Sequence, residues 1–386
     1  MRLARLRLAG FRNYAQAELQ PGGGLNLIAG ANAQGKTNLL EAIWVLSGAR
    51  SLRAADQGQL VLFGRAAASV EAALHMDASG SQRDLRLVLH RSGRRAFFVN
   101  GKAVRRFAGV VGSLAVLWFS PDEVDVVRGA PAQRRRFLDV TLAQVDAVYR
   151  DALLRYTRIV SQRNHLLRGA RDRAAGESAP VLLDAWDQQL AEVGGELTER
   201  RQELVRELER RAAGTQDEMT GGGEALKLRY RSTANGPGAG GGEPGGPGEA
   251  AERLLARLRA LRPAELARGA TLAGPHRDDL EIRLGDTDLR YFGSRGQQRT
   301  AAVSLFVAAW GWMKQRIGEP PVLLLDDVAS ELDEGRRRRL FAVLPREAQI
   351  FLTGTDAEAL AAAARGHGEV RVWRVSAGRL EVVPGS

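Results

Sequence analysis

The chain contains no cysteine in its 386 residues. This absence excludes a disulfide scaffold, a zinc site built on thiolates and a cysteine nucleophile, and it is consistent with a reducing compartment. Histidine is scarce too. The histidines show no spacing typical of metal ligands, so ordinary surface or core roles are expected for His75, His90, His165, His276 and His367.

Long apolar runs are missing as well. The first residues, MRLARLRLAGFRNY, interleave arginines with apolar residues and never offer the roughly 7 to 15 apolar residues of a signal peptide. No later run reaches the roughly 18 apolar residues of a membrane span. The balance of 44% hydrophobic and 26% charged residues is that of a globular protein. The sequence therefore predicts a cytoplasmic protein that has no membrane partner.

The charge is unbalanced toward the positive side. The chain has 56 lysines and arginines against 45 acidic residues, a net charge of +11 and a pI of about 10.7. Such a balance favours a polyanionic partner, with nucleic acid first and an anionic membrane surface second. Lysine occurs only at positions 36, 102, 227 and 314, and an arginine excess is also typical of GC-rich coding bias. Charge alone leaves nucleic-acid binding open.

The length predicts two or three lobes, at about 100 to 200 residues per domain. Residues 1–130 alternate in the manner of a mixed sheet with one early helix, and strand signals return in 266–386. Between them, 131–265 reads as a helical lobe that includes the Gly/Pro linker 236–248. Ser178 and Pro180 mark a helix start. An apolar helical seam, with residues mostly three or four positions apart, consists of Leu182, Trp186, Leu190, Val193, Leu197, Leu204 and Leu208. Arg201 interrupts this seam, which indicates packing within the lobe rather than a dimerising coiled coil.

A phosphate-binding loop is the strongest chemical signal. The pattern GxxxxGK[ST] is met by Gly30, Ala31, Asn32, Ala33, Gln34, Gly35, Lys36 and Thr37. The strand LNLIA precedes it and an amphipathic helix follows. The two glycines let backbone amides curl around phosphate oxygens at the positive end of the helix. Lys36 would reach the β- and γ-phosphates of ATP, and the Thr37 hydroxyl would bind Mg²⁺.

A second pattern, PPVLLLDDVASELD at 320–333, is an apolar strand that ends in two carboxylates. Alone, such a run is often only a strand that enters a turn. Together with the phosphate loop it has the form of a Walker B strand. Asp326 would then support the Mg²⁺ ion, and Asp327 would orient or deprotonate the attacking water.

The segment Tyr291–Gln298, about 30 residues before Asp326, opens a mostly apolar helix. It resembles the signature motif of the ABC ATPases, with Ser294, Gly296 and Gln297 in register. The segment 330–333 likewise resembles their D-loop, whereas Thr353 stands where their switch histidine is expected. In ABC-type heads the signature of one subunit caps the nucleotide of the other. The resemblance implies an ATP-dependent homodimer.

Further motifs make the chain similar to one family, the RecF recombination mediators. They are FRNY at 11–14, the elements from Pro121 to Asp139, GPHRDD at 274–279, GSRGQQRT and LLLDDVASELD. The resemblance implies an α/β fold, an ABC-type ATPase head with a mixed N-terminal sheet and a helical insertion lobe. It also implies a weak ATPase whose hydrolysis releases the dimer, which binds DNA gaps or junctions and helps RecO and RecR to load RecA in replication, recombinational repair and the SOS response.

Other interpretations stay open at this point. An ABC-type ATPase subunit that serves a membrane or another non-DNA partner is one, and a metabolic P-loop phosphotransferase is another. The triplet His276–Asp278 spells a kinase motif, but the position five residues beyond Asp278 is Arg283 rather than asparagine. The arginine runs at 134–136 and 336–339 are either phosphate contacts or solvated faces.

Overall fold

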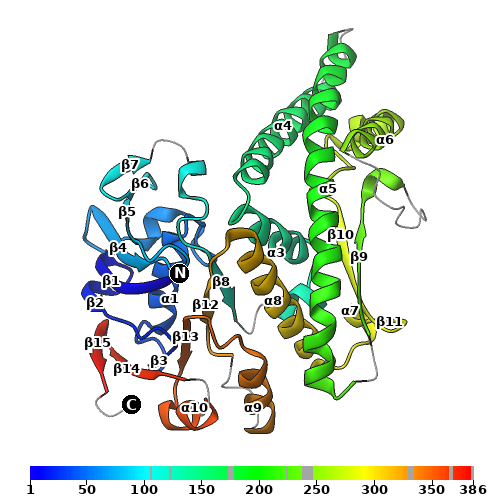
Figure 1. Cartoon of the computed structure of the whole chain (residues 1–386). Helices are drawn as coiled ribbons and strands as arrows, with labels where there is room; N and C mark the ends of the chain where they lie inside the picture. The colour runs from blue at the N-terminus through cyan, green and yellow to red at the C-terminus, as the bar shows by residue number, and fades with distance from the viewer. Residues whose placement is uncertain are drawn as a thin grey trace. The chain divides into compact units, whose positions relative to one another are not determined.

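The computed structural model describes residues 1–104, 107–120, 124–172, 178–222, 225–236, 247–328, 334–364 and 368–383. The chain forms two compact units (Figure 1). The head unit consists of Met1–Val124, Gly214–Gly222 and Ala302–Ser386, and the insertion unit of Asp125–Ala213 and Gly223–Ala301. The division into 1–130, 131–265 and 266–386 stays a prediction.

An antiparallel sheet of six strands forms the first part of the head unit, in the order β2-β1-β4-β5-β6-β7. Its strands are β1 (Arg2–Phe11), β2 (Tyr14–Leu19), β4 (Ala67–His75), β5 (Gln82–His90), β6 (Arg95–Val99) and β7 (Lys102–Val104). Buried and more exposed residues alternate along β4 and β5. One face of this sheet is therefore packed and the other meets solvent.

The second sheet of the head unit joins distant parts of the chain, in the order β15-β14-β3-β13-β12-β8. It contains β3 (Leu25–Ala29), β8 (Val116–Phe119), β12 (Val322–Leu325), β13 (Ile350–Gly354), β14 (Val370–Ser376) and β15 (Arg379–Val382). All its pairs are parallel except that of β14 with β15. Figure 1 shows the blue β3 between β13 and β14, which come from the other end of the chain. The nucleotide-type sheet is thus split by the insertion.

Helix α1 (Lys36–Leu46) lies between the two sheets, because it contacts β4 and β5 of the first and β8 and β13 of the second. Its Trp44 packs edge-on against Trp118 of β8, with ring centroids 6.1 Å apart. The other helical elements among the described residues of the head unit are η1 (Gln57–Leu60), η2 (Phe107–Val110), α9 (Glu334–Val343), α10 (Ala357–Ala363), the part of α8 (Arg295–Ile317) from Ala302 onward and the part of α5 (Ser178–Thr220) from Gly214 onward. Buried apolar residues on both sides therefore hold α1 in place. The predicted phosphate loop ends in the first turn of this helix.

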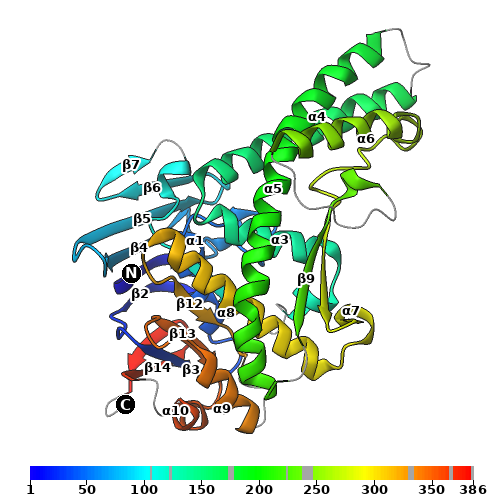
Figure 2. The ribbon, with the colours of Figure 1, turned by 45° about the vertical axis from the view of Figure 1, so that its right-hand side comes forward.

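The insertion unit is mainly helical. It contains α2 (Asp125–Arg128), α3 (Pro131–Ala143), α4 (Ala147–Asp172), α5 (Ser178–Thr220, up to Ala213), η4 (Thr233–Asn235), α6 (Pro247–Arg268) and α7 (Leu289–Phe292). A small antiparallel sheet adds β9 (Leu226–Arg231), β10 (Asp279–Leu284) and β11 (Thr287–Asp288). Figure 2 shows α4 and α6 side by side, as their contacts require. Among the described residues, no helix is long and apolar enough to cross a membrane.

The helical seam of α5 is buried over most of its length, at Leu190, Val193, Leu197, Leu204 and Leu208. The expectation for Leu182 is wrong, because its side chain is half exposed and the neighbouring Leu183 takes the buried position. Of the linker 236–248, residues 237–246 lie outside the described residues, while Pro247 and Gly248 begin α6.

Buried arginines join the helices of the insertion unit. Arg163 of α4 donates to Asp187 of α5 at 2.7 Å and to Glu265 of α6 at 2.6 Å, and all three side chains are fully buried. Arg201, which interrupts the apolar seam of α5, is buried as well and pairs with Asp139 of α3 at 2.7 Å. These buried charges are therefore interior ion pairs, which join α3, α4, α5 and α6.

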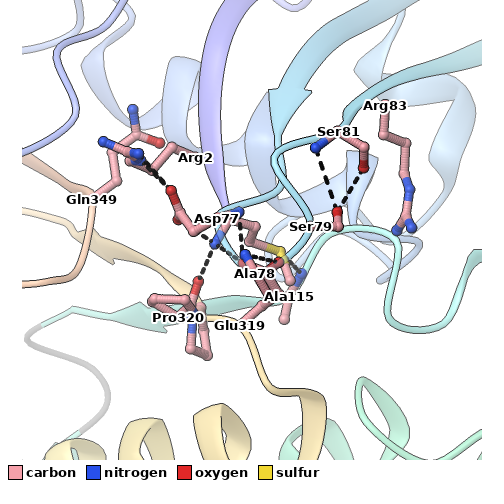
Figure 3. Close-up of polar contacts among 12 residues, drawn as sticks. Arg2, Asp77, Ala78, Ser79, Ser81, Arg83, Ala115, Glu319, Pro320 and Gln349 are labelled. Atoms are coloured by element: carbon pink, nitrogen blue, oxygen red, sulfur yellow. Dashed lines mark hydrogen bonds and ion pairs between the residues drawn. The ribbon is translucent and has the colours of Figure 1, made fainter.

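The amino group of Met1 is a buried cation in the head unit. It donates to Glu319 at 2.6 Å and to Asp77 at 2.8 Å, while Glu319 also accepts from the backbone N–H groups of Asp77 and Ala78 (Figure 3). Burial acts to raise the pKa of Glu319, but the hydrogen bonds from the Met1 amino group and from Ala78 outweigh it and leave the pKa lowered. The start of β1 is thus tied to the loop after α8.

Replacing Glu319 by glutamine should lower the free energy of unfolding by about 1–3 kcal/mol at neutral pH, because the buried amino group loses a charged partner. Since the pKa of Glu319 is lower in the folded state, its stabilisation is complete above its ordinary value of 4.5 and is lost as the pH falls through the folded pKa. Urea unfolding of parent and variant should therefore converge in acid. The control is Glu347→Gln, whose partner Lys314 is exposed; a similar loss there, or a pH-independent gap, would contradict the account.

Candidate nucleotide-binding site

The predicted phosphate loop connects β3 to α1 and carries two residues with left-handed backbone. Ala33 has a φ of 63° and Gly35 a φ of 116°. A Cβ atom on Gly35 would lie 2.5 Å from the side-chain amide nitrogen of Asn13, and one on Gly30 would lie 2.4 Å from the carbonyl oxygen of Val375. Gly35 is therefore required by its left-handed backbone and by the space around it, and Gly30 by the space alone.

The Lys36 ammonium lies inside this loop. Its Nζ donates to the carbonyl oxygens of Gly30 at 2.7 Å and Ala31 at 3.0 Å, and the residue is buried. Burial lowers the pKa of Lys36, and the charges of Asp327 and Asp326 act in the opposite direction. The ammonium thus lies within the loop and within the electrostatic influence of both predicted carboxylates, where it can pair with an anion held by the loop.

The structure brings Thr37 and Asp326 together, although they lie 289 positions apart in the chain. The Thr37 hydroxyl donates to Oδ1 of Asp326 at 3.0 Å, and the Thr353 hydroxyl donates to the same oxygen at 2.8 Å. Burial raises the pKa of Asp326, while the bonds from Thr353 and Thr37 counteract it. A hydroxyl and a carboxylate so placed are the oxygen ligands that Mg²⁺ prefers in phosphate sites.

Asp327 follows with a left-handed backbone, at a φ of 57°. Its N–H donates to the Thr353 hydroxyl at 2.9 Å, so a single threonine at the end of β13 orients both aspartates. A non-glycine residue held at positive φ marks strain that the surroundings impose, which is common where a side chain must be aimed. Thr353 stands where the switch histidine was expected and contacts the acidic pair directly.

The FRNY segment braces the phosphate loop from the first sheet. Asn13 donates to the carbonyl oxygen of Gln34 at 2.9 Å, and the Tyr14 hydroxyl donates to that of Gly35 at 2.9 Å. Gln34 also accepts, through its side chain, from the N–H of Ala377 at 2.6 Å. These bonds give a structural role to residues whose purpose the sequence left unassigned.

Two arginines beside the loop differ in role. Arg12 pairs with the buried Glu41 at 2.7 Å, so its charge is used within the fold. Arg53, in the segment after α1, lowers the pKa of Asp326 by its charge, and its Nη1 lies 3.5 Å from Oδ1 of Asn38. Sequence reasoning missed Arg53, because one arginine in an arginine-rich chain carries no distinguishing pattern.

The signature residues form the N-terminus of α8 in the insertion unit. The hydroxyl of Ser294 accepts from the N–H of Gln297 at 3.2 Å, and the side chain of Gln297 accepts from the N–H of Ser294 at 2.9 Å. This is a reciprocal capping box. Ser294 is exposed, and Gly296 lies in the first turn of the helix. The predicted D-loop, 330–333, lies outside the described residues.

The GPHRDD segment is a buried structural element. Nδ1 of His276 and the Tyr156 hydroxyl oxygen are hydrogen-bonded at 2.8 Å, and burial lowers the pKa of His276 to about 4. The carboxylate of Asp278 accepts from Tyr230 and Thr233. Of the arginine run 134–136, Arg134 fits neither of the two interpretations, phosphate contact or solvated face, because it is buried and pairs with Asp279 at 2.7 Å. Within the described ranges no group of three metal-ligating side chains gathers, and His367 falls outside them.

Comparison with known proteins gives a consistent result. The family model described as the RecF/RecN/SMC N terminal domain matches residues 2–377. Proteins named "DNA replication and repair protein RecF" from Symbiobacterium thermophilum and Chloroflexus aurantiacus are 41% and 40% identical to this chain. The first alignment covers 98% of both chains, and the second covers 97% of this chain and 98% of the relative.

Solved structures are similar as well. "Structure of the recombination mediator protein RecF-ATPrS in RecFOR pathway" matches with a TM-score of 0.89 at 30% identity, covering 99% of this chain and 98% of that one. The corresponding RecF-ATP structure matches with a TM-score of 0.85 at 30% identity, covering 99% and 97%. An Smc head domain from Pyrococcus furiosus, at 15% identity and a TM-score of 0.54, covering 99% and 95%, shares the fold. These likenesses confirm the predicted α/β head with a helical insertion.

Proposed function

Because the chain belongs to the RecF family of DNA replication and repair proteins, we propose that it is an ATP-gated dimer that acts at DNA gaps or junctions. In this proposal ATP binds with Mg²⁺ at the Gly30–Thr37 loop, and slow hydrolysis to ADP and phosphate releases the dimer. The cytoplasm, where the chromosome lies, is the compartment that this role requires.

The observation that carries the nucleotide part of the proposal is the bond between Thr37 and Asp326. A plain glycine-rich turn does not explain why a distant acidic strand ends at the Thr37 hydroxyl. Nor does it explain why a buried lysine lies within the loop, under the influence of the same carboxylates. ATP and Mg²⁺ account for all three groups, since phosphate pairs with Lys36 and the metal takes the two oxygens.

Each residue then has a chemical task. The N–H groups of residues 31–37 and the Lys36 ammonium bind the phosphates, and Thr37 with Asp326 holds Mg²⁺. Asp327, aimed by its strained backbone and by Thr353, accepts the proton of the attacking water or orients it. Such a base contributes about 10²- to 10⁴-fold to a rate, so positioning of the phosphates supplies the rest.

The signature supplies the dimeric part. Exposed Ser294 and the N-terminus of a 23-residue helix present a hydroxyl, backbone N–H groups and a positive dipole end to an anion. We propose that Ser294, with Gly296 and Gln297, caps the ATP held by a second copy. The arrangement makes ATP part of the interface, so hydrolysis weakens the dimer.

A Ser294→Ala variant should bind ATP with unchanged affinity but fail to dimerise with it. Light scattering with and without ATP and Mg²⁺ measures the mass, and a fluorescent ATP analogue measures the affinity. Ser232→Ala is the matched control, since it also removes a serine that caps a helix. Lys36→Ala should lose ATP binding. Equal dimerisation by Ser294→Ala and the parent would remove Ser294 from this role.

The DNA part of the proposal is supported by the net charge of +11 and by the names of the relatives. Positive side chains that neutralise phosphates release counterions, so binding to DNA should weaken steeply with salt. The RecFOR pathway named for the similar structures makes RecO and RecR the proposed protein partners, with RecA loading as the outcome.

A further inference from the structure

Phe63 is exposed on a tight turn of the head unit. Its side chain is 94% exposed, and it precedes Gly64, which has a φ of 80°. The turn is closed by the bond from the N–H of Arg65 to the carbonyl oxygen of Leu62 at 3.0 Å. Burying a phenylalanine is worth about 1.5–3 kcal/mol, and this fold forgoes that gain completely. A single exposed apolar side chain is common in proteins and does not by itself indicate a binding site. The structure of the turn that carries Phe63 is therefore the relevant evidence.

Arg91 clamps this turn from the end of β5. Its Nη2 donates to the carbonyl oxygens of Val61 at 3.0 Å and Leu62 at 2.6 Å, and its Nε donates to that of Arg65 at 3.0 Å. The backbone N–H of Leu62 also donates to Gly10 of β1 at 2.8 Å. One guanidinium thus binds both sides of the turn, and the ring of Phe63 is presented on a rigid support rather than on a loose loop.

The surroundings of the ring are basic. Arg65 and Arg91 flank the turn, and the N–H of Arg91 donates to Ala66 at 3.0 Å, which brings the β5–β6 hairpin with Arg94 alongside. All three arginines are exposed. Asp56 also lies here, but its Oδ1 accepts from the N–H of Gly58 at 2.7 Å. Three arginines against one carboxylate leave this surface positive.

We propose that Phe63 stacks on an unpaired base of single-stranded DNA, while Arg65 and Arg94 contact the adjacent phosphates. A rigid exposed aromatic ring among cations is the arrangement with which proteins hold single strands. Bases inside a duplex are stacked on both faces and offer no free face to Phe63. The contact is therefore restricted to the single-stranded part of a gap or junction. Arg91 is a positioning residue, because it acts through the turn. The inference rests on the proposed action at DNA gaps and assigns one of its contacts.

The test compares a gapped duplex with a blunt duplex of equal length, by fluorescence anisotropy in ATP and Mg²⁺. Phe63→Ala should weaken binding to the gapped DNA about ten-fold and leave the blunt duplex unchanged, because a base–aromatic stack contributes about 1–3 kcal/mol. Phe63→Tyr should keep the affinity. Val382→Ala, which truncates another exposed apolar residue of the head unit, is the matched control. Because Phe63 is exposed, its replacement leaves the fold intact.

Two further readouts separate stacking from other roles. Arg65→Gln should reduce the slope of log affinity against log salt concentration by about one on the gapped DNA. ATP-dependent dimerisation should be unchanged in Phe63→Ala; a loss of dimer with unchanged gap binding would identify a second copy as the occupant and overturn the proposal. If the parent binds gapped DNA and Phe63→Ala binds it equally, only this inference fails. If the parent binds neither DNA, the proposed function fails with it.

Discussion

An Asp327→Asn variant should bind ATP as tightly as the parent and hydrolyse it about 10² to 10⁴ times more slowly. The carboxamide keeps the size of the side chain and tolerates the φ of 57°, so the backbone bond to Thr353 should persist. What the variant loses is the basic oxygen. Because the dimer is released by hydrolysis in this account, light scattering should detect an ATP-bound dimer that outlasts that of the parent.

The comparison variant is Asp286→Asn, since Asp286 is fully exposed between β10 and β11. Phosphate release by this control should equal that of the parent. A normal rate for Asp327→Asn would exclude Asp327 as the catalytic carboxylate. A monomer in the presence of ATP would argue against nucleotide as part of the interface, even if the rate falls.

Replacing Arg163 by methionine should lower the free energy of unfolding of the insertion unit by about 3–5 kcal/mol. The substitution keeps the apolar stem but leaves Asp187 and Glu265 buried beside one another without their shared cation. Arg262 still donates to Asp187 at 2.6 Å, so Glu265 carries most of the penalty. Urea unfolding followed by circular dichroism, which reports mainly on the helices, measures the loss.

Arg155→Met is the matched control on the same helix. Arg155 lies 3.7 Å from Glu196 and its side chain is 59% exposed, so its replacement should cost under about 1 kcal/mol. Equal losses from the two variants would show that the interior pair contributes no more than a surface pair. The buried charges would then need another explanation than holding α4, α5 and α6 together.

Sequence patterns predict the parts of the site that are contiguous in the chain. The phosphate loop is one uninterrupted motif between a strand and a helix, and the acidic strand ends in two aspartates. The contact between the loop and the acidic strand, through Thr37 and Asp326, is expected once both strands are placed in one parallel sheet. Parallel strands bring their carboxyl ends to the same edge. Catalytic roles for these residues stay predictions that the variants above test.

Features that depend on tertiary contacts could not be predicted from the sequence. Asn13 looks like any polar residue after a strand, yet it supports Gln34 from another sheet. Arg201 reads as a break in the apolar seam, and only the folded structure brings Asp139 of α3 to it as a carboxylate partner. Leu182 and Leu183 are adjacent leucines, and the rotation of the helix decides which is buried. Periodicity predicts that a helix has a buried face, but not these particular partners.

The most direct measurement is the affinity for a gapped duplex at two salt concentrations, with and without ATP and Mg²⁺, for the parent and for Lys36→Ala. The account predicts binding that weakens steeply with salt and that ATP strengthens in the parent only. Affinity that is indifferent to nucleotide in the parent, or that ATP strengthens equally in Lys36→Ala, would contradict the claim that ATP at this loop controls DNA binding.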